Sequence, residues 1–98
     1  MDALVSVLSA LAEPTRLAAM QMLSDGGEHC VCELMRRLGA SQSRMSRHMA
    51  ALKGAGLVVD RRDAQWVRYR RNPALSREIL ALVDATIAAL PDPDRRAA

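Results

Sequence analysis

Two cysteines, Cys30 and Cys32, are the residues of this chain whose type and spacing most directly suggest chemistry, and they are its only cysteines. Thiolates bind soft and borderline ions strongly, and they are also readily oxidised. The chain shows no signal-peptide pattern and no apolar run near the roughly 18 residues that span a bilayer, so we expect a cytoplasmic protein without a membrane partner. Closely spaced thiols in that reducing compartment are typical of ion ligands or redox groups, because structural disulfides are rare there.

The positive charge of the chain is concentrated in its middle third. Residues 36–71 contain ten Lys and Arg against two acidic residues, Asp60 and Asp63, which gives this stretch a formal charge of +8. Because the whole chain carries +3, the remaining residues carry −5. Such a concentration is typical of duplex DNA binding, in which cationic side chains displace the counterions of phosphates. A basic solvated surface gives the same composition, so the charge alone leaves both interpretations open.

Apolar periodicity, proline and glycine divide the chain into five expected helices and one hairpin. Pro14 suits the first turn of a helix and disfavours helical geometry in Glu13, so we expect one helix to end near Ala12 and the next to begin at Pro14. Gly39 can end the third helix and Ser41 can cap the fourth. The expected helices cover residues 4–12, 14–25, 31–38, 41–54 and 73–90, and the expected strands at 57–59 and 66–70 flank a polar loop at 61–65.

These elements define a fold class that is mainly α with a small β-hairpin. The third helix, a tight turn and the fourth helix form a helix-turn-helix, and the hairpin that follows has the position of a wing. The sequence therefore predicts a winged helix-turn-helix with five helices and a two-stranded wing. We expect one domain over residues 1–90 and a disordered tail over residues 91–98.

The helix expected at 41–54 has a polar face suited to reading DNA. Its apolar side carries Met45, Met49 and Leu52, and Arg47 lies opposite among short or planar polar groups. Arginine can bind guanine through two hydrogen bonds, glutamine can bind adenine, and serine suits a base edge or a phosphate. His48 lies nearer the apolar side, so we expect it at the edge of the core. We predict DNA contacts from this recognition helix through Gln42, Ser43, Arg44, Ser46 and Arg47, and from the wing through Arg61, Arg62, Arg68 and Arg70.

The first and last helices carry apolar stripes that a chain of this size can bury more fully if two copies associate. A domain of 98 residues has a thin core, and a symmetric dimer would cover both stripes. We expect a homodimer whose interface includes Leu4, Leu8, Leu11, Ile79, Leu82, Val83 and Thr86.

Several segments, in order, resemble the ArsR/SmtB family and together cover most of the chain. They are LAEPTRL at 11–17, CVCEL at 30–34, SQSRMSRHMAAL at 41–52, and GLV at 56–58 followed by WVRY at 66–69. Members of that family are dimeric winged-helix repressors that leave operator DNA when a metal or metalloid binds. The resemblance implies that this chain represses transcription from an inverted-repeat operator, and that its first and last helices form the dimer interface.

The segment from Cys30 to Cys32 is similar to the arsenic-binding start of the third helix in arsenical-resistance repressors of this family. This similarity implies that As(III) or Sb(III) is the inducer and that the two cysteines bind it. Those repressors carry a third cysteine three residues further on, where this chain has Met35. A neutral thioether is a weak ligand, so we expect Met35 in the core. A small thiol, hydroxide or, for Zn(II), His29 could take the third position, whereas a methylated trivalent arsenical needs only two thiolates.

The spacing of the thiols also predicts a mechanism. Side chains two residues apart in an ideal helix point roughly 200° apart. We therefore expect an ion held by both Cys30 and Cys32 to unwind or re-aim the start of the helix at 31–38. Linkage to a dimer whose recognition helices no longer match successive major grooves would then lower the affinity for DNA.

Two other functions fit the same residues. A thiol redox or Cu(I)-type repressor would use Cys30 and Cys32 on the same DNA-binding frame. A thiol oxidoreductase or metal carrier would leave the basic surface without a role. The last helix has Glu78 and Asp84 but no histidine, so we expect no zinc site there. No catalytic triad, phosphate-binding glycine loop or paired-carboxylate motif is evident, and we expect neither an enzyme nor an organic cofactor.

Overall fold

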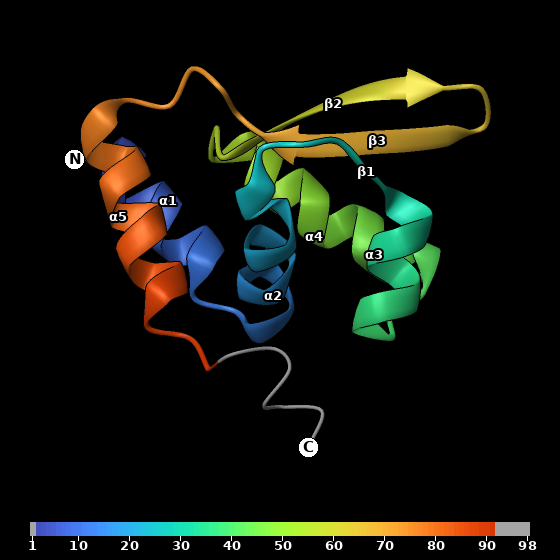
Figure 1. Cartoon of the computed structure of the whole chain (residues 1–98), viewed down its shortest axis with the longest axis horizontal. Coiled ribbons are helices and arrows are strands. Elements are labelled where there is room, and N and C mark those ends of the chain that lie inside the picture. The colour runs from blue at the N-terminus through green and yellow to red at the C-terminus, as the bar shows by residue number, and fades with distance from the viewer. Residues whose placement is uncertain (1, 92–98) are drawn as a thin grey trace.

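The computed structural model describes residues 2–91, so the tail predicted at 91–98 lies outside the described residues except for Pro91. Helices α3 and α4 form a helix-turn-helix beside a wing made by β2 and β3, while α1, α2 and α5 form the rest of the helical body (Figure 1). The winged helix-turn-helix prediction is thereby confirmed. The elements are α1 (Asp2–Leu11), α2 (Pro14–Met22), the 3-10 helix η1 (Leu23–Asp25), β1 (His29–Cys30), α3 (Val31–Leu38), α4 (Gln42–Gly54), β2 (Val58–Asp63), β3 (Trp66–Arg71) and α5 (Arg77–Ala88).

The starts of α2 and α4 follow from capping residues that are visible in the sequence. Pro14 opens α2, and the side chain of Glu13 at the N-cap accepts a hydrogen bond from the Arg16 N–H at 2.9 Å. Ser41 caps α4 in the same way, because its Oγ accepts a hydrogen bond from the Arg44 N–H at 3.2 Å. Both caps satisfy backbone donors that have no partner inside the helix.

The end of α3 agrees with the prediction, whereas the start of α5 differs from it. Gly39 follows α3 with a φ of 65°, a left-handed conformation that glycine adopts without strain. α5 begins at Arg77 and not near Pro73, because the Ser76 side chain is the N-cap and accepts a hydrogen bond from the Ile79 N–H at 3.2 Å.

The wing belongs to a three-stranded antiparallel sheet, and not to the isolated two-stranded hairpin that the sequence predicted. The strand order is β1-β3-β2. The short strand β1 pairs with β3 through His29 opposite Tyr69 and Cys30 opposite Arg68. β1 escaped prediction because two residues are too few to show the alternation that identifies a strand.

The two wing strands are longer than predicted. Their pairing runs from Val58 opposite Arg71 to Asp63 opposite Trp66, so only residues 64–65 form the turn. Ala64 adopts a positive φ of 57° in this turn. The loop expected at 61–65 is therefore mostly strand.

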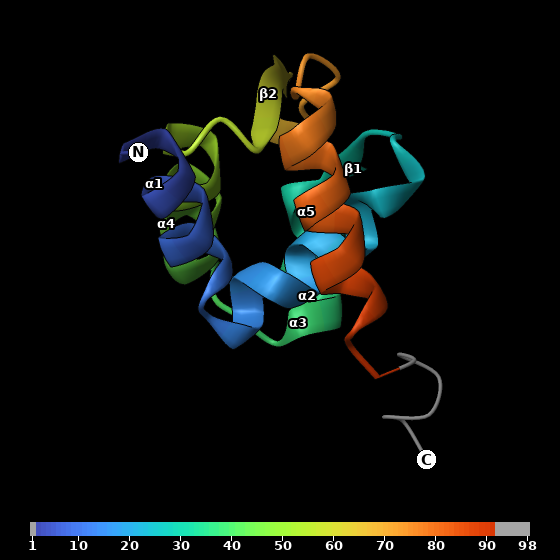
Figure 2. The same ribbon diagram turned by 90° about the vertical axis from the view of Figure 1, so that its left-hand side faces the viewer.

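The core gathers side chains from every helix and from the start of the wing. The inner face of α4 contributes Met45, Met49 and Leu52, none of which exposes any surface. Val83 of α5 is also fully buried, and Tyr69 of β3 is 7% exposed. Figure 2 shows α2 lying between α1 and α5 in the lower part of the molecule. This packing fixes α4 with one face inside the protein and the opposite face outside, as predicted.

The length and apolar character of the described helices can be compared with what is needed to cross a membrane. No single helix among residues 2–91 is long and apolar enough to cross a bilayer. Only α1 taken together with residues 14–25 reaches that length and apolar character, across a bend of 93°.

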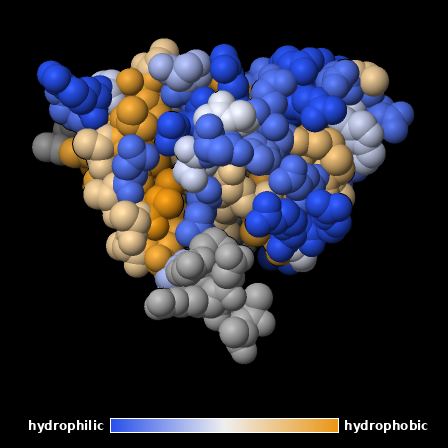
Figure 3. All heavy atoms as spheres, in the orientation of Figure 1, coloured by the Kyte–Doolittle hydropathy of each residue, from blue (hydrophilic) through white to orange (hydrophobic). Residues whose placement is uncertain are grey.

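α1 presents an apolar patch to solvent. Leu4, Val5 and Leu8 expose 42%, 54% and 46% of their surfaces. Figure 3 shows apolar side chains gathered on the side of the molecule where α5 lies, and hydrophilic ones on the side of the wing and α3. Two residues predicted for a dimer interface, Leu11 and Val83, are only 4% and 0% exposed, because they face the protomer's own core. The other five, of which Leu4 and Leu8 are exposed and Ile79, Leu82 and Thr86 are half-buried, retain surface for a partner.

Replacing Leu8 with Glu tests whether this patch is the place where two copies meet. An unpaired buried charge costs several kcal/mol, so we expect Leu8→Glu to raise the dimer dissociation constant by at least about tenfold. Sedimentation velocity measures the change. Gln65→Glu, which adds the same charge at the wing turn, is the matched control and should leave the dimer intact. Dimers of Leu8→Glu that are as stable as wild type would exclude the patch as the interface.

The N-cap of α2 predicts how stability depends on pH. Partial burial raises the pKa of the Glu13 carboxyl, but hydrogen bonds from the Arg16 and Thr15 N–H groups and the charges of His48 and Arg16 lower it by more, so the net pKa lies below its ordinary value. The stabilising contribution is present above the unfolded-state pKa of about 4.3 and is lost as the pH falls through the folded-state pKa. We expect acidification below about pH 4.3 to lower the Tm of wild type more than that of Glu13→Gln. Circular dichroism melts at several pH values measure both slopes, and equal slopes would contradict this role.

Candidate functional site

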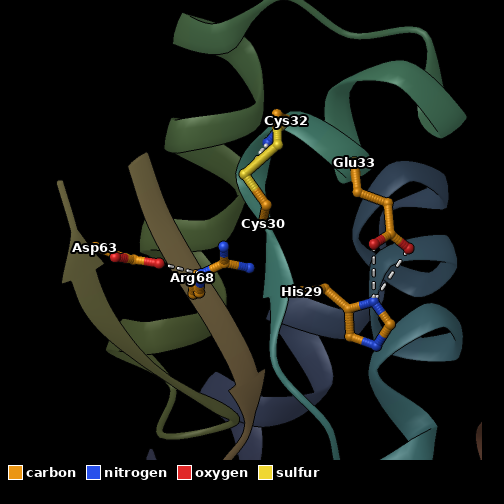
Figure 4. The surroundings of a disulfide bond; sticks show 6 residues. All are labelled: His29, Cys30, Cys32, Glu33, Asp63 and Arg68. Carbon is orange, nitrogen blue, oxygen red and sulfur yellow. Dashed lines mark hydrogen bonds and ion pairs between the residues drawn. A yellow bond between two sulfur atoms is a disulfide. The ribbon is translucent and has the colours of Figure 1, made fainter. Parts of the chain in front are cut away.

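Cys30 and Cys32 lie at the junction of β1 and α3, where a disulfide joins them (Figure 4). Cys30 ends β1 and is the N-cap of α3, with an extended backbone at φ −65° and ψ 141°, whereas Cys32 lies in the first helical turn. Their Cα atoms are 5.1 Å apart. Cys30 Sγ also accepts a hydrogen bond from the Cys32 N–H at 3.2 Å. The two sulfurs therefore share one face of the junction.

This geometry corrects one expectation about the thiols, which was that an ion bound by both sulfurs must unwind or re-aim the start of the helix. Because Cys30 lies outside α3 in extended conformation, its sulfur meets that of Cys32 while the helix stays intact. A structural disulfide was not expected in a reducing compartment, whereas redox thiols were considered. The structure joins the two sulfurs in a disulfide, and their Cα separation of 5.1 Å lies within the range of about 4.4–6.8 Å that this bond requires.

His29 points away from the two sulfurs and toward Glu33 (Figure 4). On its other side the ring contacts the Asp25 carboxylate. Its Nε2 is 3.0 Å from the Asp25 carboxylate, and its Nδ1 is 3.1 Å from Glu33 Oε1. Burial lowers the pKa of His29, but its hydrogen bonds to Asp25 and Glu33 and their charges raise it by more, so the net pKa lies above its ordinary value. Adjacent residues of a strand face opposite sides, which separates His29 from Cys30.

The third ligand considered for Zn(II) is thus turned toward other partners. No group of three or more His, Cys, Asp or Glu within residues 2–91 is placed to hold a metal ion. Met35 is partly buried against the core, as expected. The contacts of His29 with Asp25 and Glu33 left no signal in the sequence, because a four-residue spacing predicts contact only along one helix and these residues lie in η1, β1 and α3.

α4 presents its predicted reading face to solvent. Its N-cap and its three fully buried residues determine which side chains point outward. The protein body therefore leaves the polar face of α4 uncovered for a partner. The exposed residues are Gln42, Ser43, Arg44, Ser46 and Arg47.

A cluster of Glu13, Arg16 and His48 ties α4 to the corner between α1 and α2. Arg16 Nε donates to the Ala10 carbonyl at 2.6 Å, and Arg16 Nη2 donates to the Ser9 carbonyl at 3.4 Å. Arg16 Nη1 lies 3.3 Å from His48 Nδ1, which is itself 3.5 Å from Glu13 Oε2. His48 is half-buried at the core edge, as predicted. Arg16 was missed, because a partner 32 residues away leaves no local signal in the sequence.

Arg61 of the wing binds Glu28, which directly precedes β1. Its Nε donates to Oε2 at 2.8 Å, and its Nη2 donates to Oε1 at 2.8 Å, so the pair is bidentate. The hydrogen bonds from Arg61 lower the pKa of Glu28 below its ordinary value. Glu28 was a second functional candidate that the sequence analysis missed, since a contact across 33 residues again leaves no pattern.

The other three wing arginines that were predicted to contact DNA differ in their surroundings. Arg68 Nε donates to Asp63 Oδ2 at 2.7 Å, and this hydrogen bond lowers the pKa of Asp63. Arg62 and Arg70 are exposed and form no ion pair in the part of the chain that the structure describes. Of the four arginines predicted to contact DNA, Arg62 and Arg70 are therefore available directly, while Arg61 and Arg68 would have to exchange partners to reach a phosphate.

Comparison with known proteins gives relatives that match most of this chain. The family described as "Bacterial regulatory protein, arsR family" matches residues 13–59. The "Arsenic resistance transcriptional regulator ArsR2" of Pseudomonas putida is 42% identical over 83 residues, which is 85% of this chain and 72% of the relative. The "Arsenical resistance operon repressor" of Escherichia coli K12 is 39% identical over 80 residues, which is 82% of this chain and 68% of the relative.

Solved structures agree with these matches. "Reduced HlyU from Vibrio cholerae N16961" has a TM-score of 0.78 at 36% identity, covering 93% of this chain and 92% of that one. The homodimeric winged helix-turn-helix DNA-binding domain of Mb0332 from Mycobacterium bovis, a possible ArsR-family regulator, has a TM-score of 0.74 at 28% identity, covering 89% and 77%. With its winged helix-turn-helix and these similarities along most of its length, this chain belongs to the arsR family of bacterial regulatory proteins.

Proposed function

We propose that this protein is a transcriptional repressor that acts as a homodimer in the cytoplasm and leaves an inverted-repeat operator when As(III) or Sb(III) binds Cys30 and Cys32. The observation that carries the proposal is the placement of both sulfurs on one face at the start of α3, the first helix of the helix-turn-helix. Two relatives named for arsenic or arsenical resistance support this inducer. A homodimeric neighbour supports the dimer.

Binding requires reduced thiols. A cellular thiol reductant supplies two electrons and two protons to the disulfide and is itself oxidised. Each Sγ then replaces one hydroxide of As(OH)₃, its proton leaving with that hydroxide as water, so that arsenic gains two As–S bonds. The third valence keeps a hydroxide, takes a small thiol, or is already filled by carbon in a methylated arsenical. The N-terminus of α3 favours the thiolate form of both residues and so assists capture.

Two structural links join the thiols to the residues predicted to contact DNA. The first is α3 itself, which leads directly into the turn before α4. The second is the sheet, because Cys30 pairs with Arg68 on β3, and Glu28, two residues before it, binds Arg61 on β2. An ion held by Cys30 and Cys32 that shifts β1 therefore moves wing arginines as well as α4. If the ion binds more tightly to the protein with β1 shifted than to the protein that fits DNA, its binding lowers the affinity of the dimer for DNA.

The disulfide supports a second candidate, a repressor that responds to oxidants through the same two residues. A peroxide would take two electrons from the sulfurs, accept their two protons, and leave as two waters when hydrogen peroxide is the oxidant, while one S–S bond forms. The oxidised site has no thiolate with which to bind arsenic. Starting from the same reduced protein, the first candidate therefore responds to trivalent arsenic or antimony, and the second responds to an oxidant such as peroxide.

Release from DNA distinguishes these candidates. The probe is a DNA duplex selected from random sequences by the reduced wild-type dimer. Its affinity for the protein is to be measured by fluorescence anisotropy in the presence of arsenite, methylarsenite, antimonite, Zn(II), Cu(I) or peroxide. We expect the trivalent arsenicals to weaken binding by about tenfold or more. Cys30→Ser and Cys32→Ser should bind the duplex but no longer respond.

Met35→Leu is the matched control for this experiment, because it replaces the thioether at the partly buried position by an apolar side chain of similar size. It should respond to arsenicals as wild type does. Serine variants that respond normally would refute the site. A response to peroxide or Cu(I) alone would favour the corresponding alternative.

The contact between Glu28 and Arg61 predicts a change in the salt dependence of DNA binding. Glu28→Gln releases Arg61 from its carboxylate partner, so Arg61 can turn to a phosphate. We expect tighter DNA binding and a slope of log K against log salt that is steeper by about 0.9 per protomer. Glu78→Gln, which removes an exposed carboxylate from α5, is the control and should keep the wild-type slope. An unchanged slope in Glu28→Gln would show that the Glu28 carboxylate does not withhold Arg61 from DNA.

A further inference from the structure

A cationic pocket lies beside the recognition helix, where the start of α2 faces α4. It is shallow, has a volume of about 330 Å³, and is lined by Arg16, Arg44, Arg47 and His48. Three of these side chains carry a permanent positive charge. The carboxylate of this cluster, Glu13, is bound to the Arg16 N–H at 2.9 Å and lies 3.5 Å from His48. The negative charge of Glu13 is therefore directed to the N-terminus of α2 and to His48.

Arg16 is a fixed and half-buried part of this pocket. Its guanidinium has five N–H donors. Three of them are directed to the carbonyls of Ala10 and Ser9 and to the ring of His48. These contacts hold the guanidinium plane in one orientation and leave two donors for a ligand. Arg44 and Arg47, by contrast, are exposed and can move toward a bound group.

The chemistry of the pocket fits one tetrahedral oxyanion. Guanidinium groups bind phosphate oxygens through paired, charge-assisted hydrogen bonds, and Arg16 is already oriented for such a contact. A phosphodiester of duplex DNA and a free phosphate ion share this chemistry. The position of Arg47 favours the diester, because Arg47 lines the pocket and also lies on the exposed face of α4. A duplex that receives α4 in its major groove carries a phosphate strand along each side of the helix.

We propose that this pocket binds one backbone phosphate in each half of the operator, and that Arg16 is a positioning residue for the recognition helix on DNA. The inference rests on the DNA binding in the proposed function but not on the identity of the inducer. Phosphate contacts fix the register of a protein on the duplex without reading its sequence. Through Ala10 and Ser9, Arg16 also links that phosphate to the last turn of α1, the helix that carries the exposed apolar patch.

The test replaces single phosphates of the selected duplex by neutral methylphosphonates and measures the affinity of the reduced, full-length protein for each. For wild type, one position in each half-site should cost roughly tenfold to a hundredfold. In Arg16→Gln that same substitution should cost at least about threefold less than in wild type, because only the mobile Arg44 and Arg47 remain to bind the phosphate, while the losses at all other positions stay as in wild type. Arg77→Gln, which removes an exposed arginine from the start of α5, is the matched control and should keep the complete wild-type pattern.

Arg16→Gln also loses contacts to α1, so its fold requires a check. Each methylphosphonate penalty is a ratio measured within one variant, and a smaller folded fraction therefore scales all duplexes alike. Arg16→Lys, which keeps the charge but not the paired donors, should retain an intermediate penalty at the same position. A melting curve and sedimentation confirm that the variants are folded dimers.

Three results would overturn the inference. Full penalties at every position in Arg16→Gln would show that Arg16 contacts no phosphate. Saturation of the pocket by inorganic phosphate, followed by NMR, with no competition against DNA would assign it to a free anion. A wild-type protein that binds no duplex would remove the proposed function as well, whereas the first result removes this inference alone.

Discussion

The pairing of β1 with β3 is the contact on which the arrangement of the functional surfaces depends. Its register places Cys30 opposite Arg68 and makes Cys30 the last extended residue before α3. It also carries Glu28 to the edge of the wing, where it binds Arg61. Two residues of strand thus define the junction that brings the sulfurs of Cys30 and Cys32 together and attach that junction to the wing. At this junction the helix-turn-helix is connected to the hairpin, through the pairing of β1 with β3 and through the contact of Glu28 with Arg61.

Pairing within the protein changes how the charge of the middle third should be understood. Arg61 and Arg68 are held by Glu28 and Asp63, and Glu28 lies outside the basic stretch of the sequence. The formal charge of that stretch therefore exceeds the charge that the free protein offers to a polyanion. Arg16 has the opposite character, because it lies before the basic stretch and yet adds its charge to the surface around α4. The electrostatic surface is a property of the folded contacts as much as of the composition.

The sequence predicted the elements that rest on local signals. The cap at Ser41 and the spacing of Met45 and Met49 identified α4 and its buried face, because capping and periodicity involve only neighbouring residues. β1 and the contact of Arg16 with His48 were beyond reach, since each depends on residues distant in the chain. The expected distortion of α3 was wrong for a narrower reason, because it applied helical spacing to both cysteines although Cys30 precedes the helix predicted at 31–38.

The complete burial of one face of α4 limits what an allosteric signal can alter. Met45, Met49 and Leu52 have no exposed surface, and His48 is held near Arg16 and Glu13 on another side. Turning this helix about its own axis would expose the core, so the set of side chains that α4 presents to solvent stays the same. In the proposed homodimer, what can vary is the angular and axial offset of one recognition helix from the other, relative to the helical repeat of DNA. Two-fold symmetry would double the effect that a tilt of each protomer has on this offset.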